Sequence, residues 1–118
     1  MNGVLIVAHG SRAKETEVTM EAVVDMVKAK LPQTIIEWAY MEFSDQDIQK
    51  GVEALVGQGV TQIMIVPYFL FMGIHIKEDI PRMVAACAKD HPDITITMKE
   101  PFNVDQRIAD MLVDRIKE

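Results

Sequence analysis

The alternation of four apolar, strand-like runs with four helical patterns is the feature that most restricts the fold of this chain. The runs at residues 3–8 and 62–68 are almost continuously apolar, which is typical of strands buried on both faces of a parallel sheet. Strands and helices in strict alternation predict a parallel sheet with right-handed crossovers and helices on both faces. We therefore expect a single α/β domain over residues 1–118, built on a small four-stranded parallel sheet.

The element boundaries follow from the spacing of apolar residues and from the residues that begin or end helices. Ser44 is expected to cap the second helix, with Asp47 at its third position, and Pro81 to lie in the first turn of the third helix. The last helix is expected to turn its apolar positions inward, namely Val104, Ile108, Leu112 and Ile116. Strands are expected at residues 3–8, 34–41, 62–68 and 93–98, and helices at 14–31, 44–57, from about 79 and from about 103.

Three polar side chains come at or just after the ends of expected strands. His9 follows the run 3–8, Glu42 ends the second strand, and His75 follows the run 62–68 after a loop. Because parallel strands end at the same edge of a sheet, where α/β folds bind their ligands, these side chains are expected to share one rim. The run 62–68 is expected in the centre of the sheet, and the alternating Ile and Thr of residues 93–98 at its edge.

Two imidazoles at one rim make a candidate metal-binding or acid–base site, and His91 is the only other histidine in the chain. A simpler interpretation of His9 is an exposed residue in an ordinary strand-to-helix turn, and Glu42 is equally well explained as a solvated residue at a strand end. The turn after His9 can cradle a phosphate, although the complete glycine-rich motifs are absent. Arg12 in that turn can pair with a carboxylate.

The segment at residues 69–75 stays apolar after leaving its strand, where a loop normally becomes polar. Apolar surface beside polar groups is typical of a ligand site or a subunit interface, and a simple covering of the core fits as well. Glu78 and Asp79 lie three and four residues after His75, a spacing that lets a carboxylate orient the imidazole if the turn is helical.

Composition excludes several classes of partner and site. The formal net charge of −6 argues against nucleic acid as a partner, but not against an anionic small molecule held by local cations. The single cysteine, Cys87, rules out an internal disulfide and a cysteine-rich zinc site, and its apolar helical context indicates a buried thiol. No apolar stretch is long enough to span a membrane, and the first residues enter a strand without a leader pattern, so we expect a cytoplasmic protein.

Three stretches of the sequence occur together in an informative order. The apolar strand 4–8 leads into His-Gly-Ser-Arg at residues 9–12, and Met-Glu follows the second strand at 41–42. The most specific stretch is Val-Pro-x-Phe-Leu-x-x-Gly-x-His-x-x-x-Asp-Ile-Pro over residues 66–81. Taken together, they resemble the short sirohydrochlorin chelatases of the class II, CbiX-like type. The resemblance extends over essentially the whole chain and implies a chelatase-like fold, a flavodoxin-like half of the longer chelatases.

This resemblance implies that the protein inserts a divalent metal ion, cobalt in the first instance, into sirohydrochlorin during tetrapyrrole and cobalamin biosynthesis. It implies that His9 and His75 bind the ion and that His9 accepts protons, and Glu42 is the other candidate base. No prosthetic group is expected, because the metal ion is a substrate, and a homodimer is implied. The expected tetrapyrrole-binding residues are Ser11, Arg12, Asp45, Leu70, Phe71, Met72, Gly73, Ile74 and His75.

The chain departs from the family pattern at two places, and other functions fit the same residues. Residues 45–47 are Asp-Gln-Asp where the family has acidic-Pro-Ser, and residues 102–103 are Phe-Asn where it has Leu-Gly. Nickel or iron can replace cobalt, because imidazole affinity does not select cobalt among these ions. A non-catalytic carrier of metal or tetrapyrrole would use the same cleft. A flavodoxin-like regulator is disfavoured, because His9 stands where such proteins carry an acidic phosphoacceptor.

Overall fold

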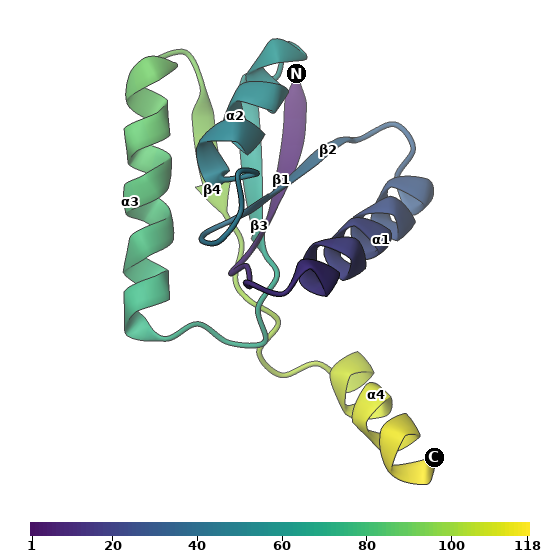
Figure 1. The fold of residues 1–118 in the computed structure, drawn as a ribbon. Helices are drawn as coiled ribbons and strands as arrows, with labels where there is room; N and C mark the ends of the chain where they lie inside the picture. Colours follow the sequence, from purple (N-terminus) through teal and green to yellow (C-terminus); the bar gives the residue numbers. More distant parts are fainter.

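Four parallel strands alternate with four helices in the structure, a computed structural model that describes all of residues 1–118 (Figure 1). The strands are β1 (Asn2–Ala8), β2 (Ile35–Tyr40), β3 (Gln62–Pro67) and β4 (Thr95–Met98). The helices are α1 (Lys14–Lys30), α2 (Ile48–Gly57), α3 (Ile74–Asp90) and α4 (Gln106–Lys117). The sheet order β2-β1-β3-β4 confirms the predicted four-stranded parallel α/β fold, with β3 inside the sheet and β4 at its edge. None of the helices has the length and apolar character needed to cross a lipid bilayer.

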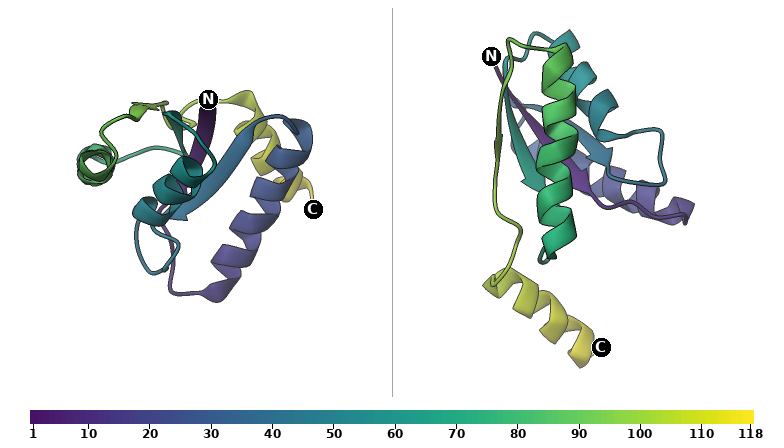
Figure 2. Two further views of the ribbon diagram at one scale, coloured as in Figure 1. Left: turned by 90° about the horizontal axis from the view of Figure 1, so that it is seen from above. Right: turned by 90° about the vertical axis from the view of Figure 1, so that its left-hand side faces the viewer.

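Helices lie on both faces of the sheet, as predicted, but they cover the two faces unequally (Figure 2). Successive side chains of a strand point to opposite faces, so each strand contributes to two separate cores. On one face α2 and α3 pack over the larger core cluster, which includes Leu5 of β1 and Ile63 of β3. On the other face α1 packs alone over a smaller cluster, to which it contributes Met20 and Val24.

The second helix begins later than predicted. Asp47 is the residue that caps α2, and its Oδ1 accepts a hydrogen bond of 2.9 Å from the Lys50 N–H. The prediction of Ser44 as the cap, with Asp47 inside the helix, is therefore wrong. The Gln46 carbonyl accepts a hydrogen bond of 2.8 Å from the Tyr40 N–H, which holds the loop against the end of β2 and delays the helix.

The third helix begins earlier than predicted. It starts at Ile74, so Pro81 lies inside the helix and not in its first turn. A proline in this position removes a helical hydrogen bond, but the apolar stripe through Ile80 and Val84 continues across it and is buried. The burial of this stripe outweighs the local cost of the proline. As a result, His75 belongs to the first turn of α3 and not to a loop.

The fourth helix begins close to the predicted position, with Asp105 as its cap. None of its residues is buried, and Leu112 and Ile116 are 61% and 82% exposed. Figure 1 shows α4 projecting past the carboxyl ends of the strands and away from the sheet. The expectation of inward packing is therefore wrong for Val104, Leu112 and Ile116, whereas Ile108 is half-buried.

Candidate active site

The carboxyl end of the sheet holds His9 and Glu42 side by side. The Met41 N–H donates to the Ala8 carbonyl and the Glu42 N–H donates to the His9 carbonyl, both at 3.0 Å. These two bonds join the chain segments directly beyond the ends of β1 and β2. The spacing between the two segments is therefore the spacing of neighbouring strands, which the sheet itself maintains.

Gly10 is the residue that permits this close approach. Its φ of +98° lies in the left-handed region, which side chains other than glycine adopt at a cost. A Cβ atom at this position would lie 2.1 Å from the backbone carbonyl oxygen of Glu42. The glycine of the His-Gly-Ser-Arg stretch is thus a steric requirement for the pairing of the two segments.

The side chains of His9 and Glu42 form a solvent-accessible pair. His9 Nε2 lies 3.2 Å from Glu42 Oε2, and His9 Nδ1 lies 3.3 Å from the Gly10 carbonyl oxygen. Each ring nitrogen faces an oxygen acceptor, so an imidazolium can donate to both, whereas a neutral ring can donate to only one. The two side chains are 48% and 53% exposed. The pair can hold a proton or pass it between carboxylate and imidazole within reach of a ligand.

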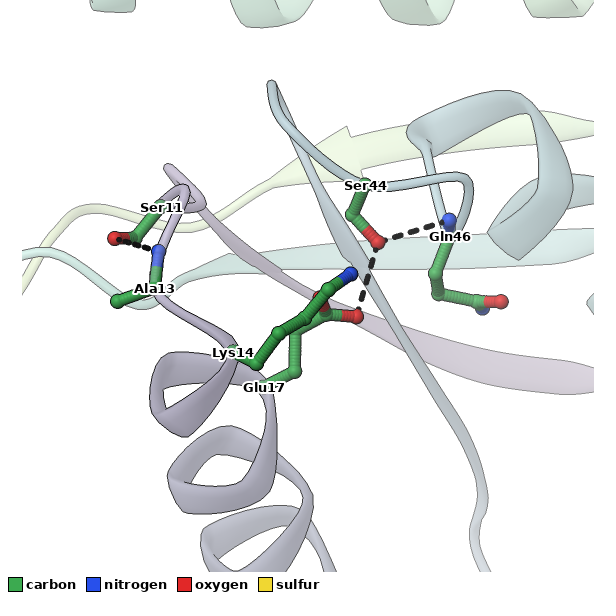
Figure 3. A network of polar contacts seen from close by, with 6 residues as sticks. All are labelled: Ser11, Ala13, Lys14, Glu17, Ser44 and Gln46. Atoms are coloured by element: carbon green, nitrogen blue, oxygen red, sulfur yellow. Dashed lines mark hydrogen bonds and ion pairs between the residues drawn. The ribbon is translucent and has the colours of Figure 1, made fainter.

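A polar network ties the loop after β2 to the start of α1 (Figure 3). The Ser44 hydroxyl donates to Glu17 Oε1 at 3.2 Å and accepts from the Gln46 N–H at 3.1 Å. Lys14 Nζ lies 3.4 Å from the other carboxylate oxygen of Glu17. This role of Ser44 is not visible in the sequence, because its partner is 27 residues away. The network thus holds the loop that carries Asp45 against the start of α1, which follows the turn at residues 9–12.

Three of the polar residues predicted to bind the tetrapyrrole, Ser11, Arg12 and Asp45, lie in loops at this rim. The Ser11 hydroxyl accepts a hydrogen bond of 3.1 Å from the Ala13 N–H, just before α1 begins. The Arg12 guanidinium lies 5.0 Å from the centre of the Phe43 ring, a cation–π arrangement. Asp45 is exposed. The part played by Phe43 was not predicted, and its only signal in the sequence is an aromatic residue directly after the strand-end glutamate.

Tyr40 forms part of the floor beneath this rim. Its ring is buried against the smaller core cluster, and its hydroxyl has no hydrogen-bond partner. Burial raises the pKa of Tyr40 above its usual value, and the carboxylates of Glu17 and Glu21 raise it further. The phenol therefore stays neutral near pH 7, and its contribution to the site is packing.

His75 is exposed in the first turn of α3. Figure 1 shows that α3 begins at this same end of the sheet. His75 forms no hydrogen bond or ion pair with His9 or Glu42, and no group of three or more histidine, cysteine, aspartate or glutamate side chains is arranged to hold a metal ion. Asp79, one of the two carboxylates expected to orient His75, pairs with Arg82 instead. The structure thus brings His9 together with Glu42 and leaves His75 apart from them on the same rim.

The apolar segment after β3 has an inner and an outer part. Phe69 and Met72 pack against the larger core cluster, so Met72 supports the segment from below. Leu70, Phe71 and Ile74 are 53%, 76% and 75% exposed. The outer part therefore offers apolar surface to a ligand or a partner subunit, and the inner part covers the core.

A hollow of about 420 Å³ lies beside this segment, between Tyr68, Leu70, Phe102 and the first turns of α4. Tyr68 and Phe102 meet edge to face at its wall, with ring centres 5.8 Å apart. The candidate reactive side chains, His9 and Glu42 with His75, lie outside its lining. They occupy open surface at the edge of the sheet.

Comparison with known proteins identifies relatives of two lengths. The chain is 40% identical over 118 residues to a sirohydrochlorin ferrochelatase of Priestia megaterium, covering all of this chain and 44% of that protein. It is 31% identical over 118 residues to a sirohydrochlorin cobaltochelatase of Sulfurisphaera tokodaii, covering all of this chain and 93% of that protein. The chain thus spans about half the length of the longer curated relatives that it matches.

A solved structure and a family profile agree with these relatives. The crystal structure of the sirohydrochlorin chelatase SirB from Bacillus subtilis subspecies spizizenii in complex with cobalt matches with a TM-score of 0.91 at 33% identity. That match covers 98% of this chain and 50% of the SirB chain. The profile of the family described as CbiX matches residues 3–118. With nearly its whole length matched, the chain belongs to the CbiX family.

Proposed function

We propose that the protein is a sirohydrochlorin chelatase, which inserts a divalent metal ion, cobalt, into the tetrapyrrole. The observation that carries this proposal is the exposed pair of His9 Nε2 and Glu42 Oε2, 3.2 Å apart, at the sheet edge where His75 also lies. Membership of the CbiX family and the names of the relatives support the choice of substrate.

The chemistry of insertion assigns a part to each of these side chains. The reaction needs a partly dehydrated ion and the removal of the pyrrole N–H protons. His9 and His75 bind the ion through neutral imidazole nitrogens, and this small number of protein ligands leaves coordination positions open for the pyrrole nitrogens. Glu42 Oε2 lies 3.2 Å from His9 Nε2, so Glu42 is the carboxylate placed to accept a pyrrole proton as general base.

The tetrapyrrole binds through its flat face and its peripheral carboxylates. The exposed side chains of Leu70, Phe71 and Ile74 contact the apolar face of the macrocycle. Arg12 pairs with a peripheral carboxylate, and the free N–H groups of the first turn of α3 favour another. Ser11, Asp45 and the rest of the segment 70–75 border the same rim.

Iron is a second candidate metal, favoured by a specific observation. The 40% identical relative is named a ferrochelatase, whereas the relative matched over 93% of its length is named a cobaltochelatase. Imidazole nitrogens bind both ions, so the ligand set alone does not choose between them. Initial rates with each ion at equal free concentration measure the preference directly.

The assembly that we propose for this function is a homodimer with its interface beside the two sites. One chain leaves its candidate reactive side chains on open surface, and a reaction that moves a proton to a carboxylate benefits from the exclusion of water. A second copy supplies the missing cover. A monomer in sedimentation experiments at tens of micromolar would contradict this assembly.

The test is an absorbance assay, without oxygen, of the purified chain with sirohydrochlorin and Co²⁺ or Fe²⁺, each compared with the protein-free reaction. We expect His9→Ala and His75→Ala to abolish the acceleration. His91→Ala is the matched control and should keep the wild-type rate, because His91 ends α3 about 24 Å along the helix from His75. Full activity of either rim variant would refute the ligand assignment. Binding of both substrates without acceleration would establish a carrier.

A further inference from the structure

Phe43 has a backbone conformation that its side chain makes unfavourable. Its φ of +64° lies in the left-handed region, which glycine and asparagine tolerate but which is rare for a bulky residue. Asn103 is the only other residue besides glycine with a positive φ, and it belongs to a tolerant type. The Phe43 side chain is exposed and belongs to neither core cluster, so burial in the core does not compensate for the strain. An aromatic residue at this position therefore needs another explanation.

The two neighbours of Phe43 in the chain hold it at the rim. The Glu42 N–H donates to the His9 carbonyl at 3.0 Å, and the Ser44 hydroxyl donates to Glu17 Oε1 at 3.2 Å. Figure 3 shows the second of these contacts, which joins the loop to α1. The segment is thus attached on one side to the end of β1 and on the other side to α1. The Phe43 ring is therefore held close to the turn that connects these two elements.

Arg12 lies in that turn, and it is the only arginine of the chain without a carboxylate partner. The other three arginines form ion pairs, namely Arg82 with Asp79, Arg107 with Asp105 and Arg115 with Glu118. Carboxylates outnumber cations in this chain, which has a net charge of −6, so the exception does not reflect a shortage of partners. The guanidinium carbon of Arg12 lies instead 5.0 Å from the centre of the Phe43 ring. A ring face attracts the cation without neutralising it, so the N–H donors stay free.

We propose that Phe43 is a positioning residue for Arg12, whose guanidinium its ring holds at the rim with the donors free for a carboxylate at the edge of the substrate. Arginine binds a carboxylate through two parallel hydrogen bonds, which require a defined orientation of the guanidinium plane. A long side chain that becomes ordered only on binding weakens the affinity, and contact with the ring restricts it beforehand. The proposal rests on the proposed function for the identity of the anion, a tetrapyrrole carboxylate. Phe43 itself acts through Arg12.

The first test is a double-mutant cycle on the affinity for metal-free sirohydrochlorin, measured by absorbance titration. Phe43→Leu keeps an apolar side chain but removes the ring face, and it should raise the dissociation constant about two- to fivefold. Arg12→Gln should raise it about tenfold or more, and adding Phe43→Leu to Arg12→Gln should have no further effect. Phe43→Tyr retains the ring face and should restore the wild-type affinity. Lys30→Gln removes the same charge at the other end of α1 and is the control for Arg12→Gln.

The second test detects the contact without substrate. The ring current of Phe43 should shift the NMR signal of the Arg12 Nε–H group, and this shift should disappear in Phe43→Leu and persist in Phe43→Tyr. An Nε–H signal that is unchanged in Phe43→Leu would overturn the proposal. So would an equal loss of affinity from Phe43→Leu in the wild-type and Arg12→Gln backgrounds, which a purely structural role predicts. A wild-type chain that binds no sirohydrochlorin would instead refute the proposed function, and with it the ligand assigned to Arg12, while the NMR comparison would still show whether Phe43 holds the guanidinium.

Discussion

Replacing Gly10 by alanine should destabilise the protein by about 3 kcal/mol, more than any other single methyl group added at a loop glycine. The φ of +98° costs an alanine about 1–2 kcal/mol. The new Cβ would also lie 2.1 Å from the Glu42 carbonyl oxygen, which is backbone and has no free rotation to escape. To relieve this contact the Glu42 segment must move. The movement breaks the 3.0 Å hydrogen bond from the Glu42 N–H to the His9 carbonyl, at a cost of about 1 kcal/mol or more.

Two other glycines separate these contributions. Gly59 has a φ of +87°, but a Cβ atom at this position would lie 4.0 Å from its nearest neighbour, the Met1 sulfur. Gly59→Ala therefore carries the backbone strain alone and should cost about 1 kcal/mol of stability. Gly57 ends α2 with no atom near its Cβ position, so Gly57→Ala should be neutral or stabilising by up to about 1 kcal/mol. The difference between Gly10→Ala and Gly59→Ala isolates the contact with Glu42.

Urea unfolding followed by circular dichroism, with linear extrapolation to water, measures all three variants on one scale. A second measurement is chelatase turnover under conditions where Gly10→Ala is folded, which should fall because the Glu42 carboxylate moves with its backbone. If the free energies of unfolding of Gly10→Ala and Gly59→Ala agreed within about 0.5 kcal/mol, the contact with the Glu42 carbonyl would not contribute to the loss of stability, and this prediction would be refuted.

Three further predictions concern single ionisable groups. Glu42→Gln should retain tetrapyrrole affinity and lose about two to four orders of magnitude in turnover, measured by steady-state kinetics, whereas a normal rate would leave His9 as the base. The hydrogen bond from the Arg107 side chain lowers the pKa of Asp105 from 3.8 to about 2, so the contribution of this pair to stability is present above pH 4 and is lost as the pH falls through about 2. In Arg107→Gln the pKa of Asp105, followed by NMR, should return towards its ordinary value, and an unchanged midpoint would exclude this cause. Burial raises the pKa of the Cys87 thiol, with nearby carboxylates adding to it, so a disulfide reagent should react slowly with the native protein and rapidly in urea; equal rates would contradict its burial.

The sheet was predictable because burial on both faces leaves a clear signal in the sequence. The runs that become β1 and β3 are almost continuously apolar, and alternation with helices then determines a parallel order. The helix starts were less predictable, because contacts distant in sequence decide them. Serine is a residue type that commonly caps helices, but the Ser44 hydroxyl donates to Glu17 instead. Pro81 resembles a first-turn residue, but the buried stripe through Ile80 extends the helix seven residues before it.

The candidate site was predictable to the level of strand ends and not beyond. The geometry of parallel strands is enough to place His9 and Glu42 together, since both follow neighbouring strands. The pairing of Asp79 with Arg82 depends on where α3 begins, and the prediction from the sequence started this helix too late. The exposure of α4 was unpredictable for a different reason. An amphipathic pattern shows that one side of a helix is to be buried, but it does not show which chain provides the surface.

The two backbone hydrogen bonds just beyond β1 and β2 separate the candidate reactive pair from the loops proposed to recognise a ligand. His9 and Glu42 are held by the sheet, whereas the loops at residues 43–47 and 70–73 carry the side chains that would meet the rest of a substrate. Changes in these loops can alter which macrocycle or peripheral group is accepted without moving the imidazole away from the carboxylate. An engineer who wishes to retarget the protein should therefore diversify the loops and leave residues 8–10 and 41–42 untouched.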